Sequence, residues 1–254
     1  MKKLKGLLLL FLFCGSCQAA FGFGLDGSLA EWGATPGAWG PGSDWVPLPG
    51  IHYAVEDYQP GTADGFVDPG FGGQTFDVEA MYATRDSENL YFAVVTGFPS
   101  LGFQGWSPSP IAIDFGSDGT YEYGIDVVAE EASNVGNLYK PESWTQGPYN
   151  NWGYGVVGYL AYPVDMVNPS LALNPAVANL VYNNLYYGAT GHYVIEGFMP
   201  ISAFDTDWRD VFTMHWTMGC GNDFIHLGVI PEPATLALFG LGLLGAVMRR
   251  RKLS

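Results

Sequence analysis

The chain has 254 residues, of which 35 are glycine, 15% are aromatic and only 14% are charged. This composition is too apolar and aromatic for a disordered chain, and too rich in glycine for a helical bundle. The length is ample for a real hydrophobic core in one large or two small domains. We therefore expect an all-β protein with many turns.

The first nineteen residues have the pattern of a signal peptide. Three lysines within residues 1–5 precede an apolar run at 7–13, and Ala19 is a small residue suited to cleavage. Two alternatives are a buried first strand and a lipoprotein signal at Cys17. We predict that residues 1–19 direct export and are removed by signal peptidase.

The segment between the two tails is strongly acidic. Residues 20–230 contain three basic residues against 24 acidic ones, a formal charge of −21, because seven of the ten Lys and Arg residues lie in the tails. Such a surface repels nucleic-acid phosphates and anionic lipid, so we expect no nucleic-acid partner. It favours divalent cations, basic partners or neutral glycans, although acidity alone also keeps exported proteins soluble.

The cysteine and histidine residues do not have the spacing of a metal centre. Once the signal peptide is removed, Cys220 is the only cysteine, so no intrachain disulfide can form. His215, Cys220 and His226 lack the closely spaced pairs that zinc sites use. We interpret them as a buried thiol and two structural histidines.

The strands follow a long loop, rich in Gly and Pro, at residues 33–73. In residues 76–83 successive side chains alternate between two faces of a strand, which puts Phe76, Val78, Ala80 and Tyr82 on the same face. Residues 90–96 return as a second strand that is buried on both faces. Further strands are expected at 111–114, 121–128, 156–161, around 185–187, at 192–198 and, as the last strand, at 211–218. These short strands predict an antiparallel β-sandwich of jelly-roll or immunoglobulin-like type.

The turn after the third predicted strand is a candidate calcium site. Asp114, Asp118 and Glu122 supply carboxylates around two glycines, which is the chemistry that hard cations prefer. The spacing departs from the helical calcium loop, and the flanking segments are strands. A Ca²⁺ site in a β-turn is therefore one interpretation, and ordinary Asp-Gly turn chemistry is the favoured one.

A loop rich in aromatic residues is a candidate glycan site. Trp144, Tyr149, Trp152 and Tyr154 supply flat apolar rings, and neighbouring amides supply partners for sugar hydroxyls. The alternative is that these rings close the open end of the sandwich.

Catalytic motifs do not occur in recognisable form. The sequence has no Gly-x-Ser-x-Gly elbow, and no hydrolase motif frames a pair of its carboxylates. We predict that the protein is not an enzyme, with a secreted hydrolase of unrecognised site as an alternative.

Scattered pieces of the central segment resemble a carbohydrate-binding family. Asp26-Gly27, Leu29 and Trp32 open the segment, and later pieces are Leu90-Tyr91, Ile113-Asp114, Tyr193 to Glu196, Pro200-Ile201-Ser202 and Asn222-Asp223. In this order they resemble type-9-like carbohydrate-binding modules and DOMON-like β-sandwiches. The resemblance spans roughly residues 25–225 and implies a sandwich that binds glycan.

The last residues have three parts in a fixed order. Pro231, Glu232 and Pro233 precede an apolar run at 234–248, and a basic cluster follows, made of Arg249, Arg250, Arg251 and Lys252. The run is short for a membrane span of about 20 residues, and the basic cluster belongs on the cytoplasmic side. We expect a membrane helix at the end of the chain, with the globular part of the protein outside the cytoplasm.

This tail resembles the PEP-CTERM sorting signal of Gram-negative bacteria that make exopolysaccharide. The resemblance implies cleavage near Pro231-Glu232-Pro233 by an exosortase, a membrane cysteine protease. Cleavage would end a transient anchorage in the inner membrane and release the protein to the cell surface or matrix.

The sequence therefore predicts three regions: a signal peptide at 1–19, a β-sandwich ectodomain at 20–228 and a sorting signal at 229–254. The predicted function is that of an exported surface protein associated with exopolysaccharide or biofilm matrix through glycan binding. A purely structural surface protein without a small ligand is the main alternative.

Overall fold

The fold is described from a computed structural model, whose described part is discontinuous. It comprises residues 23–35, 45–56, 66–67, 70–127, 135–147, 162–172, 179–187 and 190–230.

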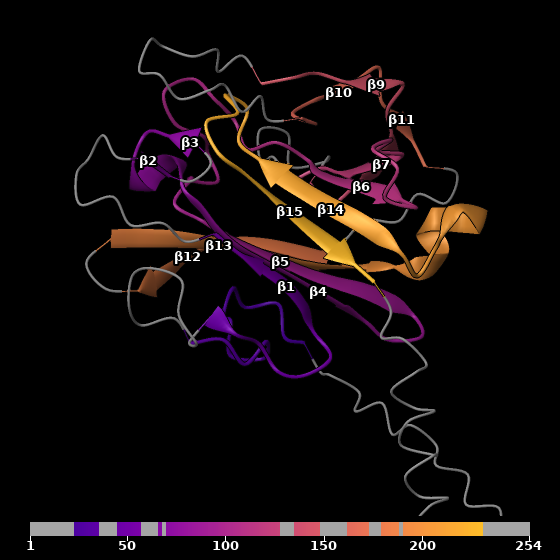
Figure 1. Cartoon of the computed structure of the whole chain (residues 1–254), viewed down its shortest axis with the longest axis horizontal. Coiled ribbons are helices and arrows are strands. Elements are labelled where there is room, and N and C mark those ends of the chain that lie inside the picture. The colour runs from indigo at the N-terminus through magenta and orange to yellow at the C-terminus, as the bar shows by residue number, and fades with distance from the viewer. Residues whose placement is uncertain are drawn as a thin grey trace, which may run out of the picture.

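Two antiparallel sheets form the two layers of a sandwich (Figure 1). The first sheet has the order β1 (His52–Val55), β4 (Val78–Arg85), β5 (Asn89–Thr96), β13 (Thr190–Pro200) and β12 (Asn179–Tyr187). The second has the order β11 (Ser170–Leu171), β8 (Leu138–Lys140), β7 (Tyr123–Ile125), β6 (Ile111–Phe115), β14 (Phe212–Thr217) and β15 (Phe224–Val229). The predicted all-β antiparallel sandwich is confirmed.

Two small strand pairs and two 3-10 turns accompany the two main sheets. Two further two-stranded antiparallel sheets are β2 (Phe66–Val67) with β3 (Gly70–Phe71), and β9 (Ser143–Trp144) with β10 (Met166–Val167). A 3-10 turn, η2 (Gln74–Phe76), leads into β4, and η3 (Ile201–Asp207) carries the chain from β13 in one sheet to β14 in the other.

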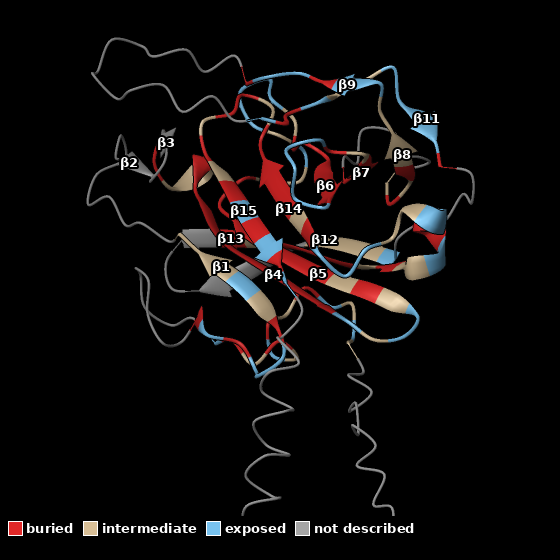
Figure 2. Cartoon of the chain, turned by 45° about the vertical axis from the view of Figure 1, so that its right-hand side comes forward, coloured by how far each residue is buried: buried red, intermediate tan, exposed pale blue. Residues whose placement is uncertain are grey.

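The main core lies between the sheets. Phe92, Val94, Ile113 and Trp216 are among its fully buried side chains, and they come from both layers. Burial is almost continuous along β5 (Figure 2). Each fully buried large apolar side chain contributes about 1.5–3 kcal/mol to folding. Because the core between the sheets is the largest cluster of buried apolar residues, it supplies most of the hydrophobic stabilisation.

A second core lies on the outer face of the first sheet. There the segments 23–35 and 45–51 cover the sheet, and their fully or nearly fully buried side chains Leu29, Trp32 and Trp45 pack against it. In Figure 1 this indigo segment lies on the side of β1, β4 and β5 that faces away from β14 and β15. The first sheet is therefore covered on both faces, which explains why β4 and β5 are buried almost throughout.

The predicted hairpin is confirmed as β4 and β5, but its alternation is wrong beyond Val78. The register shifts between Val78 and Ala80, so that Glu79 is an extra residue in a β-bulge. A one-residue shift exchanges the two faces of a strand. Phe76 and Val78 therefore face the main core, whereas Ala80 and Tyr82 face the second core.

Several other strand predictions need correction. β1 lies within the segment that was expected to be a loop, and the last strand is β15 and not 211–218. The predicted strand at 121–128 is limited to β7, because the residues before it form the Asp-Gly turn. The strand predicted at 156–161 lies outside the described residues.

Among the described residues, no helix has both the length and the apolar character needed to cross a membrane. The predicted membrane helix of the tail lies outside them.

Candidate functional site

A cavity of about 420 Å³ opens beside the second sheet. Its lining brings aromatic and charged side chains together from β8, β9, η3 and the turn before β7, and consists of Thr120, Tyr121, Glu122, Lys140, Pro141, Glu142, Ser143, Trp144, Tyr162 and Asp207. Figure 2 shows exposed residues along β9 and β11 on this side of the molecule. The volume lies in the range of small-molecule sites.

Trp144 forms the inner part of the aromatic wall. Its indole N–H donates to the Tyr121 carbonyl oxygen at 2.8 Å, and only 9% of the residue is exposed. The absence of a side chain at Gly124 makes room for it, because a Cβ there would lie 2.8 Å from the Trp144 ring and 2.5 Å from the Met166 sulfur. Trp144 is thus a fixed part of the wall, and not the exposed platform that the sequence suggested.

Tyr162 is the exposed aromatic residue of the cavity. It is 38% exposed and contacts Tyr121 edge-on, with 6.1 Å between ring centroids. Tyr121 also contacts Trp144 edge-on at 6.4 Å. Tyr121 and Tyr162 were not among the predicted site residues, because neither lies in the cluster of loop aromatics from which the glycan site was predicted.

The polar part of the lining includes an ion pair. Lys140 Nζ lies 2.6 Å from Asp207 Oδ2, and the Tyr123 hydroxyl donates to the same oxygen at 2.8 Å. The contact with Lys140 lowers the pKa of Asp207 most, and the hydrogen bond from Tyr123 lowers it further. The contact with Asp207 is also the largest cause of the raised pKa of Lys140. Both side chains are about 40% exposed, so the pair orients two polar groups towards the cavity more than it stabilises the fold.

The lining carries more negative than positive charge. Glu122, Glu142 and Asp207 stand against Lys140 alone. Burial raises the pKa of Glu122, and the nearby carboxylates of Asp114 and Asp118 raise it further, against a backbone hydrogen bond that lowers it. This arrangement suits a neutral or cationic ligand and disfavours an anionic one.

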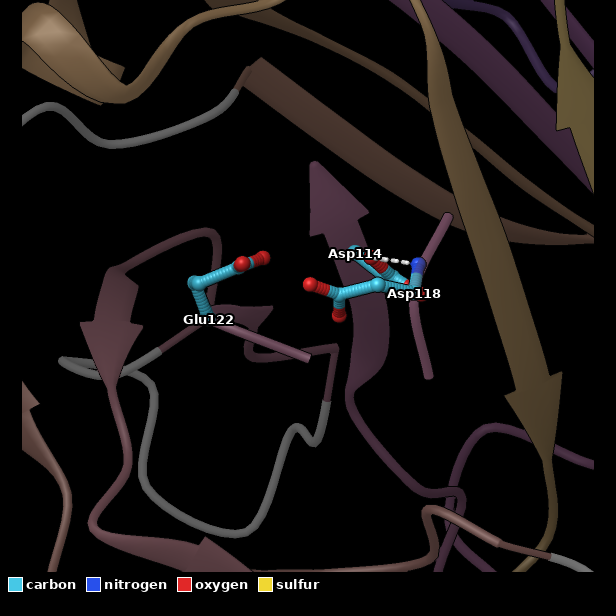
Figure 3. Close-up of side chains that lie close together, drawn as sticks. All are labelled: Asp114, Asp118 and Glu122. Carbon is cyan, nitrogen blue, oxygen red and sulfur yellow. Dashed lines mark hydrogen bonds between the residues drawn. The ribbon is translucent and has the colours of Figure 1, made fainter. Parts of the chain in front are cut away.

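The predicted calcium ligands are brought together at the edge of this cavity. One carboxylate oxygen from each of Asp114, Asp118 and Glu122 lies within 4.8 Å of the others. Figure 3 shows the Glu122 and Asp118 side chains directed towards one another, with Asp114 behind them. No other such group of three metal-ligating side chains occurs in the described part of the chain.

Each of these carboxylates also accepts a hydrogen bond from the backbone. Asp114 receives the N–H groups of Asp118 at 3.2 Å and Gly119 at 2.8 Å, and Glu122 receives that of Phe115 at 2.8 Å. Asp118 receives the N–H of Thr120 at 2.9 Å. These contacts account for the cluster as a capped turn, which is the favoured interpretation of the sequence.

We expect Asp114→Ala to destabilise the protein by about 1–3 kcal/mol, because two turn N–H groups lose their acceptor next to a buried position. Chemical denaturation of both proteins measures the difference. Repeating it with added Ca²⁺ separates the two interpretations. The turn interpretation predicts no stabilisation of the wild type, whereas a Ca²⁺-dependent gain that Asp114→Ala abolishes would identify a cation site.

Other predicted site residues lie outside the described part of the chain. These are the remaining glycan candidates Tyr149, Trp152 and Tyr154, and the sorting residues Pro231, Glu232, Pro233, Arg249, Arg250 and Arg251.

The two histidines form a cross-strand pair below the cavity, while Cys220 lies in the main core. His215 Nδ1 is 3.2 Å from His226 Nδ1, and His226 is 3.4 Å from the Tyr121 hydroxyl. Cys220 is a buried free thiol, and burial raises its pKa to about 11. The three residues therefore do not converge on one point.

We expect the melting temperature to fall as the pH is lowered from about 7.5 to about 5.5. Burial holds the pKa of His215 well below its ordinary value, and the neighbouring His226 lowers it further. Below an ordinary histidine pKa of about 6.5 the unfolded chain binds more protons than the folded one, so stability is lost. His215→Gln should flatten this dependence, and an unchanged slope would contradict the assignment to His215.

Two of the pieces that resemble carbohydrate-binding modules are in direct contact. The buried Glu196 carboxylate accepts the Trp32 indole N–H at 2.9 Å and the Gly27 backbone N–H at 3.0 Å. Burial raises the pKa of Glu196, while these two hydrogen bonds lower it. This contact joins β13 to residues 23–35, which with residues 45–51 form the covering segment of the first sheet. The family resemblance itself stays a prediction.

The ectodomain is thus an antiparallel β-sandwich with an aromatic-lined cavity beside one sheet. Residues 229–252 match the PEP-CTERM protein-sorting motif, which confirms the prediction from the tail. The motif implies export, processing by an exosortase and sorting to the cell surface. No curated protein and no solved structure matches the chain.

Proposed function

We propose that this exosortase-targeted surface protein is a non-enzymatic ectodomain that binds neutral glycan of the surrounding exopolysaccharide. The supporting observation is the cavity of about 420 Å³, in which an exposed tyrosine faces charged and hydroxyl groups. Sugars present apolar C–H faces to aromatic rings and hydroxyls to charged side chains. The Tyr162 ring serves the first need, and the Lys140–Asp207 pair with Ser143 serves the second.

The charge of the site selects the class of sugar. Three acids and one base line the cavity, within an ectodomain of formal charge −21. Uronate or sulfated chains would bring like charge into this field, whereas neutral chains would not. The ligand is therefore a neutral oligosaccharide segment of the matrix.

Calorimetric titration of the purified protein with neutral and anionic oligosaccharides tests the proposal. We expect binding of neutral ligands only, and a loss of about tenfold in affinity in Tyr162→Ala, which corresponds to about 1.4 kcal/mol. The matched control is Tyr53→Ala, because Tyr53 is 44% exposed on β1 of the other sheet. The proposal fails if no neutral glycan in a broad panel binds.

The same titration addresses the alternatives. Absence of binding across the panel would favour a purely structural surface protein. Hydrolysis of a glycan, lost in Glu122→Gln, would replace the proposal by a hydrolase.

A further inference from the structure

The loop between β5 and β6 exposes apolar side chains at one end of the sandwich. This 97–109 loop carries Leu101, which is 84% exposed, with Trp106 at 40% and Phe103 at 39%. Single exposed apolar residues are common on protein surfaces, but three within six residues of one loop form a local patch.

Backbone hydrogen bonds hold the patch in one conformation. Phe103 and Trp106 exchange two backbone hydrogen bonds of 2.9 Å across a two-residue turn, in which Gln104 and Gly105 have φ values of 52° and 84°. Positive φ at both central residues defines a tight hairpin turn. Gly102 also has positive φ, and a Cβ there would lie 2.2 Å from the Trp106 carbonyl oxygen.

The loop is also attached to the rest of the fold. The Phe103 ring packs edge-on against Phe76 at 5.7 Å, and the Gly219 N–H donates to the Ser107 carbonyl oxygen at 2.8 Å. The Trp106 ring lies beside Gly219, within 3.8 Å of the place that a Cβ would take. Within the described part of the chain, no hydrogen bond occupies the Trp106 indole N–H. A rigid ring with an available donor binds at low entropic cost.

The patch lies at the end of the sandwich opposite Val229, the last residue of β15. Pro108 bridges to Met218 at the end of β14, where Thr217 pairs with Phe224. The chain then runs along β15 to Val229, at the opposite end, before it enters the tail (Figure 1). Six strand residues span roughly 20 Å, so the patch and Val229 lie about the length of β15 apart.

The patch belongs to a long stretch of the sequence that has no charged residue. No charged residue occurs between Glu88 and Asp114, although residues 20–230 carry a formal charge of −21. An anionic or cationic partner would find no charged side chain to pair with in the loop itself, whereas an uncharged partner needs none. The formal charge of −21 argues against an anionic lipid surface and against a second copy of this chain.

We propose that Leu101, Phe103 and Trp106 form a second glycan contact, which takes the flat face of a neutral polysaccharide chain. Its Trp106 ring covers the C–H face of a sugar unit, and the indole N–H donates to a hydroxyl. This inference extends the proposed function, but it uses a surface separate from the cavity. The cavity binds short segments, and the loop attaches the domain to polymer.

Sedimentation of the full-length protein in detergent with insoluble neutral polysaccharide tests this contact. We expect Trp106→Ala to weaken binding to the polymer about tenfold and Leu101→Ala about threefold, while calorimetric affinity for soluble oligosaccharide is unchanged in both. Leu101→Ala guards against misfolding, because Leu101 is almost fully exposed. The matched control is Leu171→Ala on β11, where Leu171 is 54% exposed.

The outcomes distinguish this contact from the cavity. If the protein sediments with the polymer only when Trp106 is present, and binds no soluble oligosaccharide, the result supports the glycan contact at the loop and excludes glycan binding in the cavity. Equal sedimentation of Trp106→Ala and wild type overturns the loop proposal even if the cavity binds. It is also overturned if Trp106 is required for binding phosphatidylcholine vesicles, or for self-association, and not for binding polymer.

Discussion

Trp32→Ala is expected to lower the free energy of unfolding by about 3–5 kcal/mol, which is the usual cost of deleting a buried Trp side chain. Trp32 is fully buried in the second core, between the covering segment and Tyr82 of β4. Its loss also removes one of two hydrogen-bond donors to the buried Glu196 carboxylate. Urea denaturation followed by circular dichroism measures the change.

Two companion variants separate packing from hydrogen bonding. Trp32→Phe keeps most of the ring but removes the N–H, so we expect about 1–3 kcal/mol. Val46→Ala alters an exposed residue of the same covering segment and should stay within about 0.5 kcal/mol. If Trp32→Ala were as mild as Val46→Ala, the covering segment would not be part of the folded core.

Gly97→Ala is expected to be the most damaging glycine-to-alanine substitution within the described part of the chain. A Cβ at Gly97 would lie 1.6 Å from the Gln74 carbonyl oxygen, which is backbone and cannot rotate away. Gly97 also donates its N–H to the Asp77 carbonyl oxygen at 2.9 Å. Residue 97 therefore cannot move away from residues 74–77 without loss of that hydrogen bond. Overpacking of this kind costs about 1–3 kcal/mol and occasionally more. We expect a cost at or above the upper limit, measured by thermal and chemical unfolding.

Gly228→Ala is the matched control. Gly228 lies in β15, nothing lies within 4 Å of its Cβ position, and the residue is exposed. Removing a glycine where alanine fits restricts the unfolded chain and is neutral or slightly stabilising. Similar losses in Gly97→Ala and Gly228→Ala would show that the close approach of residues 74 and 97 is not rigid.

The sequence predicted the fold class well because local signals agree with the tertiary structure in the β4–β5 hairpin. The Asp86 turn is an example, since its carboxylate accepts the N–H groups of Glu88 at 2.7 Å and Asn89 at 2.8 Å. The bulge at Glu79 carries no local signal. It depends on tertiary contacts, among them Glu79 with His192 at 2.6 Å and the Val78 N–H with Asp223 at 2.6 Å.

The covering segment was not predicted because its burial depends on distant residues. Trp45 lies in the segment rich in Gly and Pro that was predicted as a loop, and Trp32 directly precedes that segment. Both bury the outer face of a sheet whose strands β4, β5 and β13 come later in the chain. Only the Asp-Gly-x-Leu-x-x-Trp pattern hinted at a partner, and that partner is Glu196.

The candidate site was predicted in part. Two residues that line the cavity had been selected from local sequence patterns, Trp144 as a glycan candidate and Glu122 as a calcium candidate. Tyr162, Lys140 and Asp207 could not be foreseen, because they meet through the packing of β8, η3 and a loop far apart in the sequence. The 97–109 loop was missed because its exposed residues resemble an ordinary hydrophobic stretch in the sequence.

Intact-mass analysis of the protein from surface and medium fractions of its own host shows whether both ends of the chain are removed. If the protein is exported and processed by an exosortase, its mass should correspond to a chain that begins near residue 20 and ends near Pro231-Glu232-Pro233. Surface protein that still extends to Ser254 would contradict the account.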